Sequence, residues 1–160
     1  MKKLILFTAF TIFFSASFCQ NHRSFLADFG AGITNHAEFN GDLQFGFQKP
    51  YADYYLTAVG SVFAARWHND KSTHALVGPR FNYVLVKNKS LTGIDIVPFT
   101  SLRREWYGNG ESRWTPDLGF NIIKYVNTIS TEQGGYYLSP RIQFNSNTRF
   151  VITIGMRGIL

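Results

Sequence analysis

One short segment of this chain gathers side chains that serve in hydrolases and in metal sites. His68, Asp70, Ser72 and His74 lie within residues 68–74. A serine hydrolase needs a base within hydrogen-bond reach of the hydroxyl, oriented by a third group, and adjacency in a polar turn does not impose that geometry. The segment is therefore interpreted as a solvated loop, and a hydrolase that uses His74 with a serine of this loop stays as the alternative.

Other chemistry-bearing motifs are missing from the sequence. It has no HExxH pair, no calcium-loop spacing and no glycine-rich phosphate loop. Its single cysteine, Cys19, belongs to the leader described below. We therefore expect no catalytic residue, no metal site and no cofactor.

A second set of chemically active residues is spread along the whole chain. It consists of acids and arginines that alternate with apolar residues: Asp28, Asp42, Arg80, Asp95, Asp117, Arg141 and Arg157. Isolated buried charges are prohibitively costly, but acids and arginines that compensate one another can be buried together. We expect these seven residues to form a structural network inside the fold. Binding of a ligand by the same residues is the weaker alternative.

The elements that must position these charges are strands. Apolar and polar residues alternate with a period of two, which is typical of half-buried strands. Eight runs show this alternation: Phe25–Ile33, Asp42–Gln48, Tyr54–Arg66, His74–Val86, Thr92–Leu102, Pro116–Tyr125, Tyr136–Phe144 and Arg149–Ile159. Turn-forming residues separate them, among them Asn40-Gly41 and Asn109-Gly110. The pattern predicts one all-β domain, an antiparallel up-and-down barrel over residues 20–160.

The alternation fits two architectures. In a soluble, lipocalin-like barrel the apolar face points inward, whereas in a transmembrane barrel it meets lipid and the polar face packs the interior. The length of the runs matches the roughly 9–11 residues that cross a tilted hydrocarbon layer. The polar faces also lack the lysine and glutamate that a solvated face collects, since Lys49, Lys71, Lys87 and Lys89 fall in turns. These observations favour the transmembrane barrel, with a soluble periplasmic binder of small ligands as the alternative.

The first residues predict export. Lys2 and Lys3 precede an apolar run from Leu4 to Phe14, and small residues follow it. This layout is typical of a secretory signal peptide, here residues 1–19. The alternative is a lipoprotein signal in which Cys19 is kept and acylated. The whole chain has a formal charge of +6, and two of the lysines that contribute to it lie in this leader. The remaining modest and scattered charge, together with export, argues against nucleic acid as a partner.

With this pattern the chain resembles the small eight-stranded outer-membrane β-barrels of Gram-negative bacteria. Two strand segments echo each other, VGPRFNYVL at 77–85 and LSPRIQFN at 138–145, and look like the recurring Pro-Arg strands of these barrels. The Cys19-Gln20 junction looks like the leaders of Bacteroidota. Barrels of this family usually end in an aromatic residue, whereas this chain ends in Leu160. The resemblance implies the outer membrane as location, with its lipids or lipopolysaccharide as partners.

The expected function lies at the barrel surface. An eight-stranded barrel has an interior just wide enough for its own side chains, so a general pore is not expected. The longest connection, residues 103–115, is predicted to be an exposed loop that contacts lipid or a surface or periplasmic protein partner. Its candidate contact residues are Arg103, Arg104, Trp106, Tyr107 and Trp114. A role in envelope integrity or surface contact is thus expected, with an outer-membrane lipid hydrolase as a further alternative.

Overall fold

The chain is built from strands. The computed structural model describes residues 24–48, 53–65, 73–86, 93–126, 133–145 and 148–159, so the predicted signal peptide at 1–19 lies outside the described residues. The strands are β1 (Ser24–Thr34), β2 (Glu38–Gln48), β3 (Tyr54–Ala65), β4 (His74–Tyr83), β5 (Ile94–Tyr107), β6 (Ser112–Val126), β7 (Gln133–Gln143) and β8 (Arg149–Ile159). The described part of the chain holds no helix that is long and apolar enough to cross a membrane.

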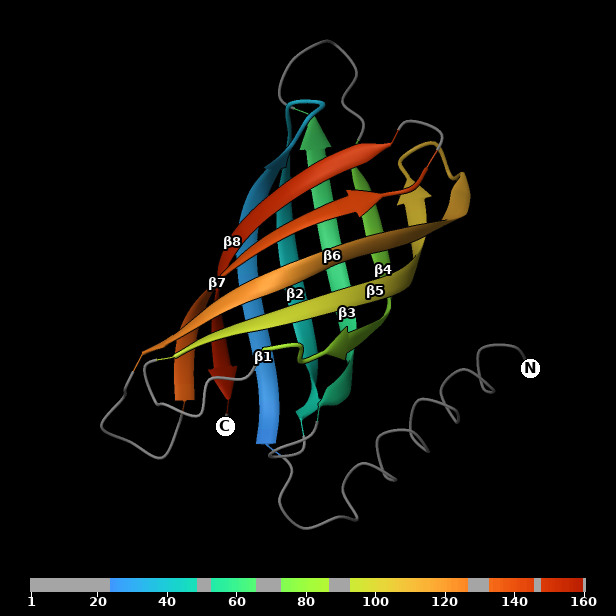
Figure 1. Ribbon diagram of the computed structural model, residues 1–160. Coiled ribbons are helices and arrows are strands. Elements are labelled where there is room, and N and C mark those ends of the chain that lie inside the picture. Colours follow the sequence, from blue (N-terminus) through green and yellow to red (C-terminus); the bar gives the residue numbers. More distant parts are fainter. Residues whose placement is uncertain are drawn as a thin grey trace, which may run out of the picture.

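The eight strands form one closed barrel (Figure 1). Each strand pairs antiparallel with the next one along the chain, for example Asp42 opposite Ser61 between β2 and β3. The barrel closes between β1 and β8, where Asp28 lies opposite Arg157. Closure leaves no edge strand with unpaired backbone groups. The predicted eight-stranded antiparallel barrel is confirmed.

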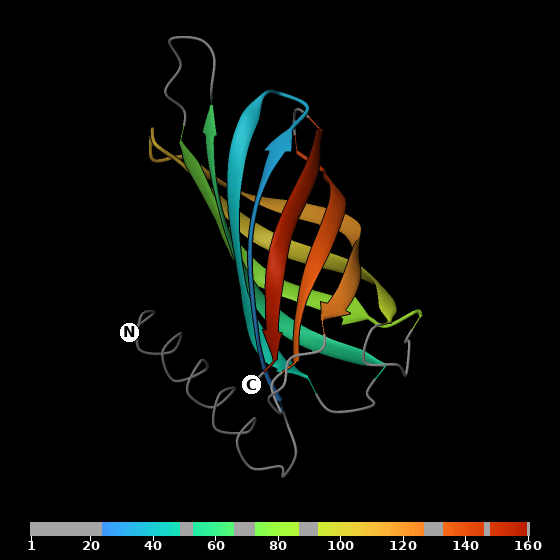
Figure 2. The same cartoon turned by 90° about the vertical axis from the view of Figure 1, so that its left-hand side faces the viewer.

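The two ends of the barrel differ in what they carry. At the lower end in Figure 1, β1 begins and β8 ends, with Leu26 opposite Ile159. At the upper end lie the short turn between β1 and β2 and the hairpin between β5 and β6, both also visible in Figure 2. Gly110 in the second turn has a φ of +86°, and Asn109-Gly110 lies in a turn as the sequence predicts.

Side chains alternate strictly between the two faces of the barrel wall. On β8, Phe150, Ile152, Ile154 and Met156 are exposed on the outer face, while Val151, Thr153 and Arg157 are buried inside. The same alternation runs along every strand, because successive side chains of a strand point to opposite faces. The barrel therefore has an apolar exterior and a mostly polar interior.

Strand β2 begins earlier than the sequence pattern predicts. Its first residue is Glu38 rather than Asp42, so Asn40-Gly41 lies within the strand and does not form the expected turn. Phe39 pairs with Ile33 of β1 and projects outward, and Asn40 donates a hydrogen bond from Nδ2 to Thr153 Oγ1 of β8 (3.1 Å). Pairing with both neighbouring strands thus overrides the local turn preference of Asn-Gly.

The predicted exposed loop at 103–115 is also a strand pair. β5 runs on to Tyr107 and β6 starts at Ser112, with Arg104 opposite Trp114 and Trp106 opposite Ser112. A tight turn closes the hairpin, in which the amide of Gly110 donates to the carbonyl of Tyr107 (3.0 Å). The prediction of a long loop is wrong because cross-strand pairing continues the ladder beyond the point where the local apolar pattern weakens.

Candidate functional site

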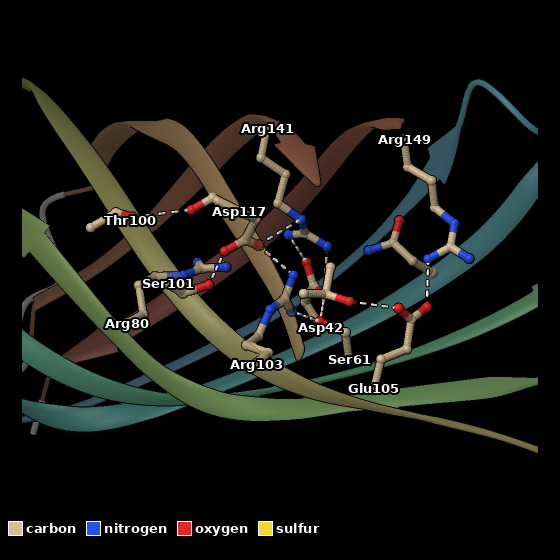
Figure 3. A network of polar contacts seen from close by, with 12 residues as sticks. Asp42, Ser61, Arg80, Thr100, Ser101, Arg103, Glu105, Asp117, Arg141 and Arg149 are labelled. Atoms are coloured by element: carbon tan, nitrogen blue, oxygen red, sulfur yellow. Dashed lines mark hydrogen bonds and ion pairs between the residues drawn. The ribbon is translucent and has the colours of Figure 1, made fainter. Parts of the chain in front are cut away.

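A network of charged side chains occupies the middle of the barrel interior. We call it the central network and define it as Asp42, Ser61, Ser101, Arg103, Asp117 and Arg141 (Figure 3). It joins β2, β3, β5, β6 and β7, and all its members are buried. The alternation of these strands places each of them on the inner face.

Asp42 and Arg141 form the first half of the central network. The guanidinium of Arg141 donates from both terminal nitrogens to the Asp42 carboxylate, at 3.0 Å for the Nη2–Oδ1 pair. Ser61 Oγ and Thr153 Oγ1 donate to the same carboxylate at 2.5 and 3.0 Å. Asp42 therefore has both oxygens occupied by donors from three other strands.

Asp117 and Arg103 form the second half. Asp117 accepts hydrogen bonds from Arg103 Nη2 and from Ser101 Oγ. Its Oδ2 also lies 3.8 Å from Arg141 Nε, which links the two halves. Because each carboxylate has at least one arginine beside it, the cost of burying these charges is offset within the network.

A second group of charges lies nearer the upper end. We call it the upper cluster: Glu38, His74, Glu105, Arg113 and Arg149. The Glu105 carboxylate accepts from Arg149 Nη1 (2.7 Å), Arg113 Nε (3.0 Å) and Thr115 Oγ1 (2.7 Å). Arg149 Nε in turn lies 3.2 Å from Glu38 Oε2. The cluster links β2, β5, β6 and β8 through ion pairs.

His74 is part of this cluster and not of a solvated loop. The residue is 3% exposed, and its ring stacks on Phe63 at 4.9 Å between centroids and places Nε2 3.5 Å from Glu105 Oε1. The prediction that the whole 68–74 segment is solvated is therefore wrong at His74, because this residue already belongs to β4 and faces inward. Residues 68–72 lie outside the described residues.

The lower end of the lumen is filled differently. The lower cluster consists of apolar and tyrosine side chains: Leu26, Tyr55, Val84, Val97, Ile123 and Tyr137. One ion pair lies beside it, in which Arg157 donates from Nε and Nη2 to the two oxygens of Asp28 at 2.8 and 2.6 Å. Arg157 Nη1 also donates to Tyr55 Oη at 3.1 Å. This end is therefore closed mainly by packing.

Two inward-facing glycines make room for the large arginines. A Cβ atom on Gly78 would lie 2.7 Å from the Cα of Arg103, and one on Gly119 would lie 2.6 Å from the Cβ of Arg141. Both distances are shorter than real Cβ contacts allow. The absence of a side chain at these positions lets the wall approach the arginine stems closely.

The structure places all seven interior charges predicted from the sequence on the inner face, buried: Asp28, Asp42, Arg80, Asp95, Asp117, Arg141 and Arg157. It does not bring them into one network. Asp42, Asp117 and Arg141 meet in the central network, whereas Asp28 and Arg157 form a separate pair. Arg80 donates to Gln44 Oε1 (2.9 Å) and lies over the ring of Phe99 (3.9 Å).

Four further interior charges were not predicted: Glu38, Arg103, Glu105 and Arg149. The sequence did carry a signal for two of them. Arg103 and Glu105 continue the odd-numbered inward series of Asp95, Val97, Phe99 and Ser101 on β5. Extending that parity beyond Leu102 would have placed both side chains in the lumen.

The five candidate contact residues separate across the wall of the hairpin. Arg103 was predicted at the surface but is fully buried in the lumen. The prediction is wrong because Arg103 continues the inward-facing odd-numbered positions of β5. Tyr107 also belongs to the inner face, where the guanidinium of Arg113 lies 4.7 Å from its ring centroid. Trp106 and Trp114 are exposed outside, and Arg104 lies on the same face, opposite Trp114. The outer face thus keeps three of the five.

Acids and arginines that compensate one another fill much of the lumen. Buried side chains from all eight strands occupy it, and six of them are acids, set against five buried arginines and the partly exposed Arg113. No group of three or more His, Cys, Asp or Glu side chains among the described residues is arranged to hold a metal ion. The geometry is that of a compensated structural interior.

Comparison with known proteins identifies the fold. No family model matches the chain, and no curated protein matches its sequence. A solved structure described as "De novo design of transmembrane beta-barrels" is similar over 88% of this chain and 98% of its own, with a TM-score of 0.51 and 16% identity. The crystal structure of Neisserial surface protein A is similar over 84% of this chain and 95% of its own, with a TM-score of 0.53 and 11% identity. The chain therefore shares its closed eight-stranded fold with a designed transmembrane barrel and with a Neisserial surface protein.

Proposed function

We propose that this protein is a small outer-membrane β-barrel that serves envelope integrity or contacts at the membrane surface, and that it is not a general pore. The observation that carries the proposal is the inverted distribution of polarity. Large apolar side chains such as Phe29, Leu43 and Ile154 are exposed on the outside, while Asp42, Arg103 and Asp117 are buried inside. A lipid-facing barrel needs this arrangement, whereas a barrel in water exposes polar side chains.

The filled lumen supports the second part of the proposal. Arg103, Glu105, Gln143, Phe63 and Ile123 are fully buried and come from β3, β5, β6 and β7. A conducting pore would have to break the ion pairs of the upper cluster and the central network in turn. The function then lies in the outer surface and the turns, with outer-membrane lipid or lipopolysaccharide and a surface or periplasmic protein as the partner classes.

The experiment that tests this proposal is fractionation of expressing cells, followed by conductance measurements. The protein should sediment with outer membranes, require detergent for extraction, and give no stable channel in planar bilayers. Recovery in the soluble periplasmic fraction without detergent would instead indicate a soluble ligand-binding barrel. Reproducible channels of porin size would overturn the filled-lumen role.

A non-enzymatic role is part of the same proposal. It is supported by the position of His74, whose ring faces Phe63, Tyr107 and Glu105 inside the barrel and is separated from the lipid-facing surface by the barrel wall. Purified protein incubated with labelled outer-membrane lipids should release no product. Lipid turnover that disappears in the His74→Ala variant would establish the competing lipid hydrolase.

A further inference from the structure

Charged side chains are nearly absent from the outer face of the barrel. Along the described strands, the outward positions hold two of them, Arg104 on β5 and Lys124 on β6, and both are cations. On β5, between the levels of Arg104 and Lys124, the outward residue Thr100 is polar, and its hydroxyl donates to the carbonyl of Asp117 (3.3 Å). An exterior that tolerates two cations and no acid is complementary to anionic ligands.

Each of these cations lies directly opposite an exposed aromatic residue of the neighbouring strand. Arg104 is opposite Trp114, with its guanidinium carbon 5.5 Å from the centre of the indole ring. Lys124 is opposite Tyr136 on β7. Both aromatic residues are 58% exposed. Trp and Tyr favour the headgroup level of a bilayer, where one end of the ring is apolar and the other is wet.

The distance between the two cation–aromatic pairs matches the thickness of a membrane. Lys124 lies ten positions after Trp114 on β6. At a rise of about 3.3 Å per residue this is about 33 Å along the strand, or about 25 Å along the axis for a strand tilt of about 40°. The apolar band of a transmembrane barrel is about 25 Å tall. The outward residues in between are Pro116, Leu118, Phe120 and Ile122.

We propose that the Arg104–Trp114 and Lys124–Tyr136 pairs each bind the phosphate of an anionic lipid headgroup, one pair in each leaflet. This inference rests on the proposed membrane location. Arg104 donates a hydrogen bond from one terminal nitrogen to Ser112 Oγ, and its other N–H groups can contact a phosphate. A guanidinium can bind phosphate through two parallel hydrogen bonds. The aromatic rings set the depth of the barrel, and the cations select the lipid.

Lipid retention measured by native mass spectrometry tests the proposal. The folded chain is released from detergent micelles that contain equimolar phosphatidylglycerol and phosphatidylcholine. One cation near a membrane surface is worth about five-fold in binding, so we expect the wild type to retain phosphatidylglycerol preferentially. Arg104→Gln should reduce this preference about five-fold, Lys124→Gln should do the same, and Arg104→Lys should restore part of it. Thr100→Val, an outward change between the two pairs, is the matched control and should leave the preference unchanged.

Two outcomes would overturn the proposal. If Arg104→Gln lowers stability but keeps the wild-type lipid preference, the Arg104–Trp114 pair only braces the hairpin. If inorganic phosphate at millimolar concentration abolishes the preference, the site recognises free phosphate and not a lipid. Insertion into phosphatidylcholine vesicles, measured on the same samples by heat-modifiable gel mobility, separates this inference from the proposed function. A chain that fails to insert refutes the membrane location, whereas a chain that inserts without lipid preference refutes only the headgroup sites.

Discussion

The central network and the lower cluster fill the same lumen by opposite means. In the central network, Asp42, Asp117, Arg103 and Arg141 meet through ion pairs and hydrogen bonds. In the lower cluster, Leu26, Val97 and Ile123 pack with tyrosine rings, and the Asp28–Arg157 ion pair lies beside them. The two regions share the same wall and the same alternation, so the difference comes from the residues alone.

The two types of filling contribute differently to the fold. Ion pairs and hydrogen bonds are directional, so the central network accepts one relative register of β2, β5, β6 and β7 and penalises a shifted one. Apolar packing in the lower cluster is less selective, but it does not incur the cost of burying charge. We therefore infer that the network specifies the alignment of the strands and that the lower cluster supplies packing energy.

The largest effect is expected when one arginine of the central network is removed. Arg141→Ala leaves Asp42 without its bidentate partner and removes the contact to Asp117. Breaking a buried pair from one side costs about 3–5 kcal/mol. Urea titration in detergent micelles, read by heat-modifiable gel mobility, should show this loss. Glu111→Ala in the exposed hairpin turn is the control and should stay within about 0.5 kcal/mol. Equal midpoints for the two variants would contradict a stabilising network.

A somewhat smaller effect is expected in the lower cluster. Ile123→Ala removes a fully buried side chain, and such truncations cost about 2–4 kcal/mol through lost packing and a residual cavity. The neighbouring Ile122 faces outward, so Ile122→Ala should cost less, because lipid or detergent fills the vacated space. The same urea titration compares the two. A larger loss for Ile122→Ala would reverse the assignment of inside and outside.

Replacing an inward-facing glycine tests whether the arginine beside it needs the space that the missing side chain leaves. Gly119→Val would place a side chain against Arg141, Pro140 and Phe99, and overpacking of this kind costs about 1–3 kcal/mol. Gly41→Val is the control, because a Cβ there meets nothing within 4 Å. Thermal unfolding in micelles should separate the variants. Similar melting temperatures would show that Arg141 can move aside at little cost.

The smallest effect is expected when the Asp28–Arg157 pair is replaced as a whole by apolar residues. The Asp28–Arg157 pair lies beside the apolar lower cluster, so replacing both members at once by Leu and Met extends that cluster. Replacing a whole buried pair by apolar residues is often close to neutral, and we expect the Asp28→Leu, Arg157→Met double variant to lose about 0–2 kcal/mol, less than Arg157→Met alone. A double-mutant cycle in urea measures the coupling. Strictly additive losses would show that the pair is not a unit.

Much of the fold could be predicted from local pattern. The bounds of β8 agree with the predicted run, and β1 and β3 agree within a residue at each end. The larger errors fall where local preference and pairing disagree, at the start of β2 and across the β5–β6 hairpin. In addition, β7 begins at Gln133 and not at Tyr136, and β4 ends at Tyr83 and not at Val86. Asn40-Gly41 favours a turn, and the segment at 103–115 lacks apolar runs, yet both pair with neighbouring strands because each such pairing adds backbone hydrogen bonds.

By itself the sequence determined which side chains of a strand share a face, because the period of two along a strand is a property of the backbone. Asp28, Asp42, Arg80 and Arg141 could therefore be assigned to one face before any pairing was known. Which acid meets which arginine was decided only by the tertiary structure. Asp42 and Arg141 are 99 residues apart, and Asp28 and Arg157, on the two strands that close the barrel, are 129 apart. Their contacts depend on the stagger of eight strands around a closed cylinder, and no local segment encodes that stagger.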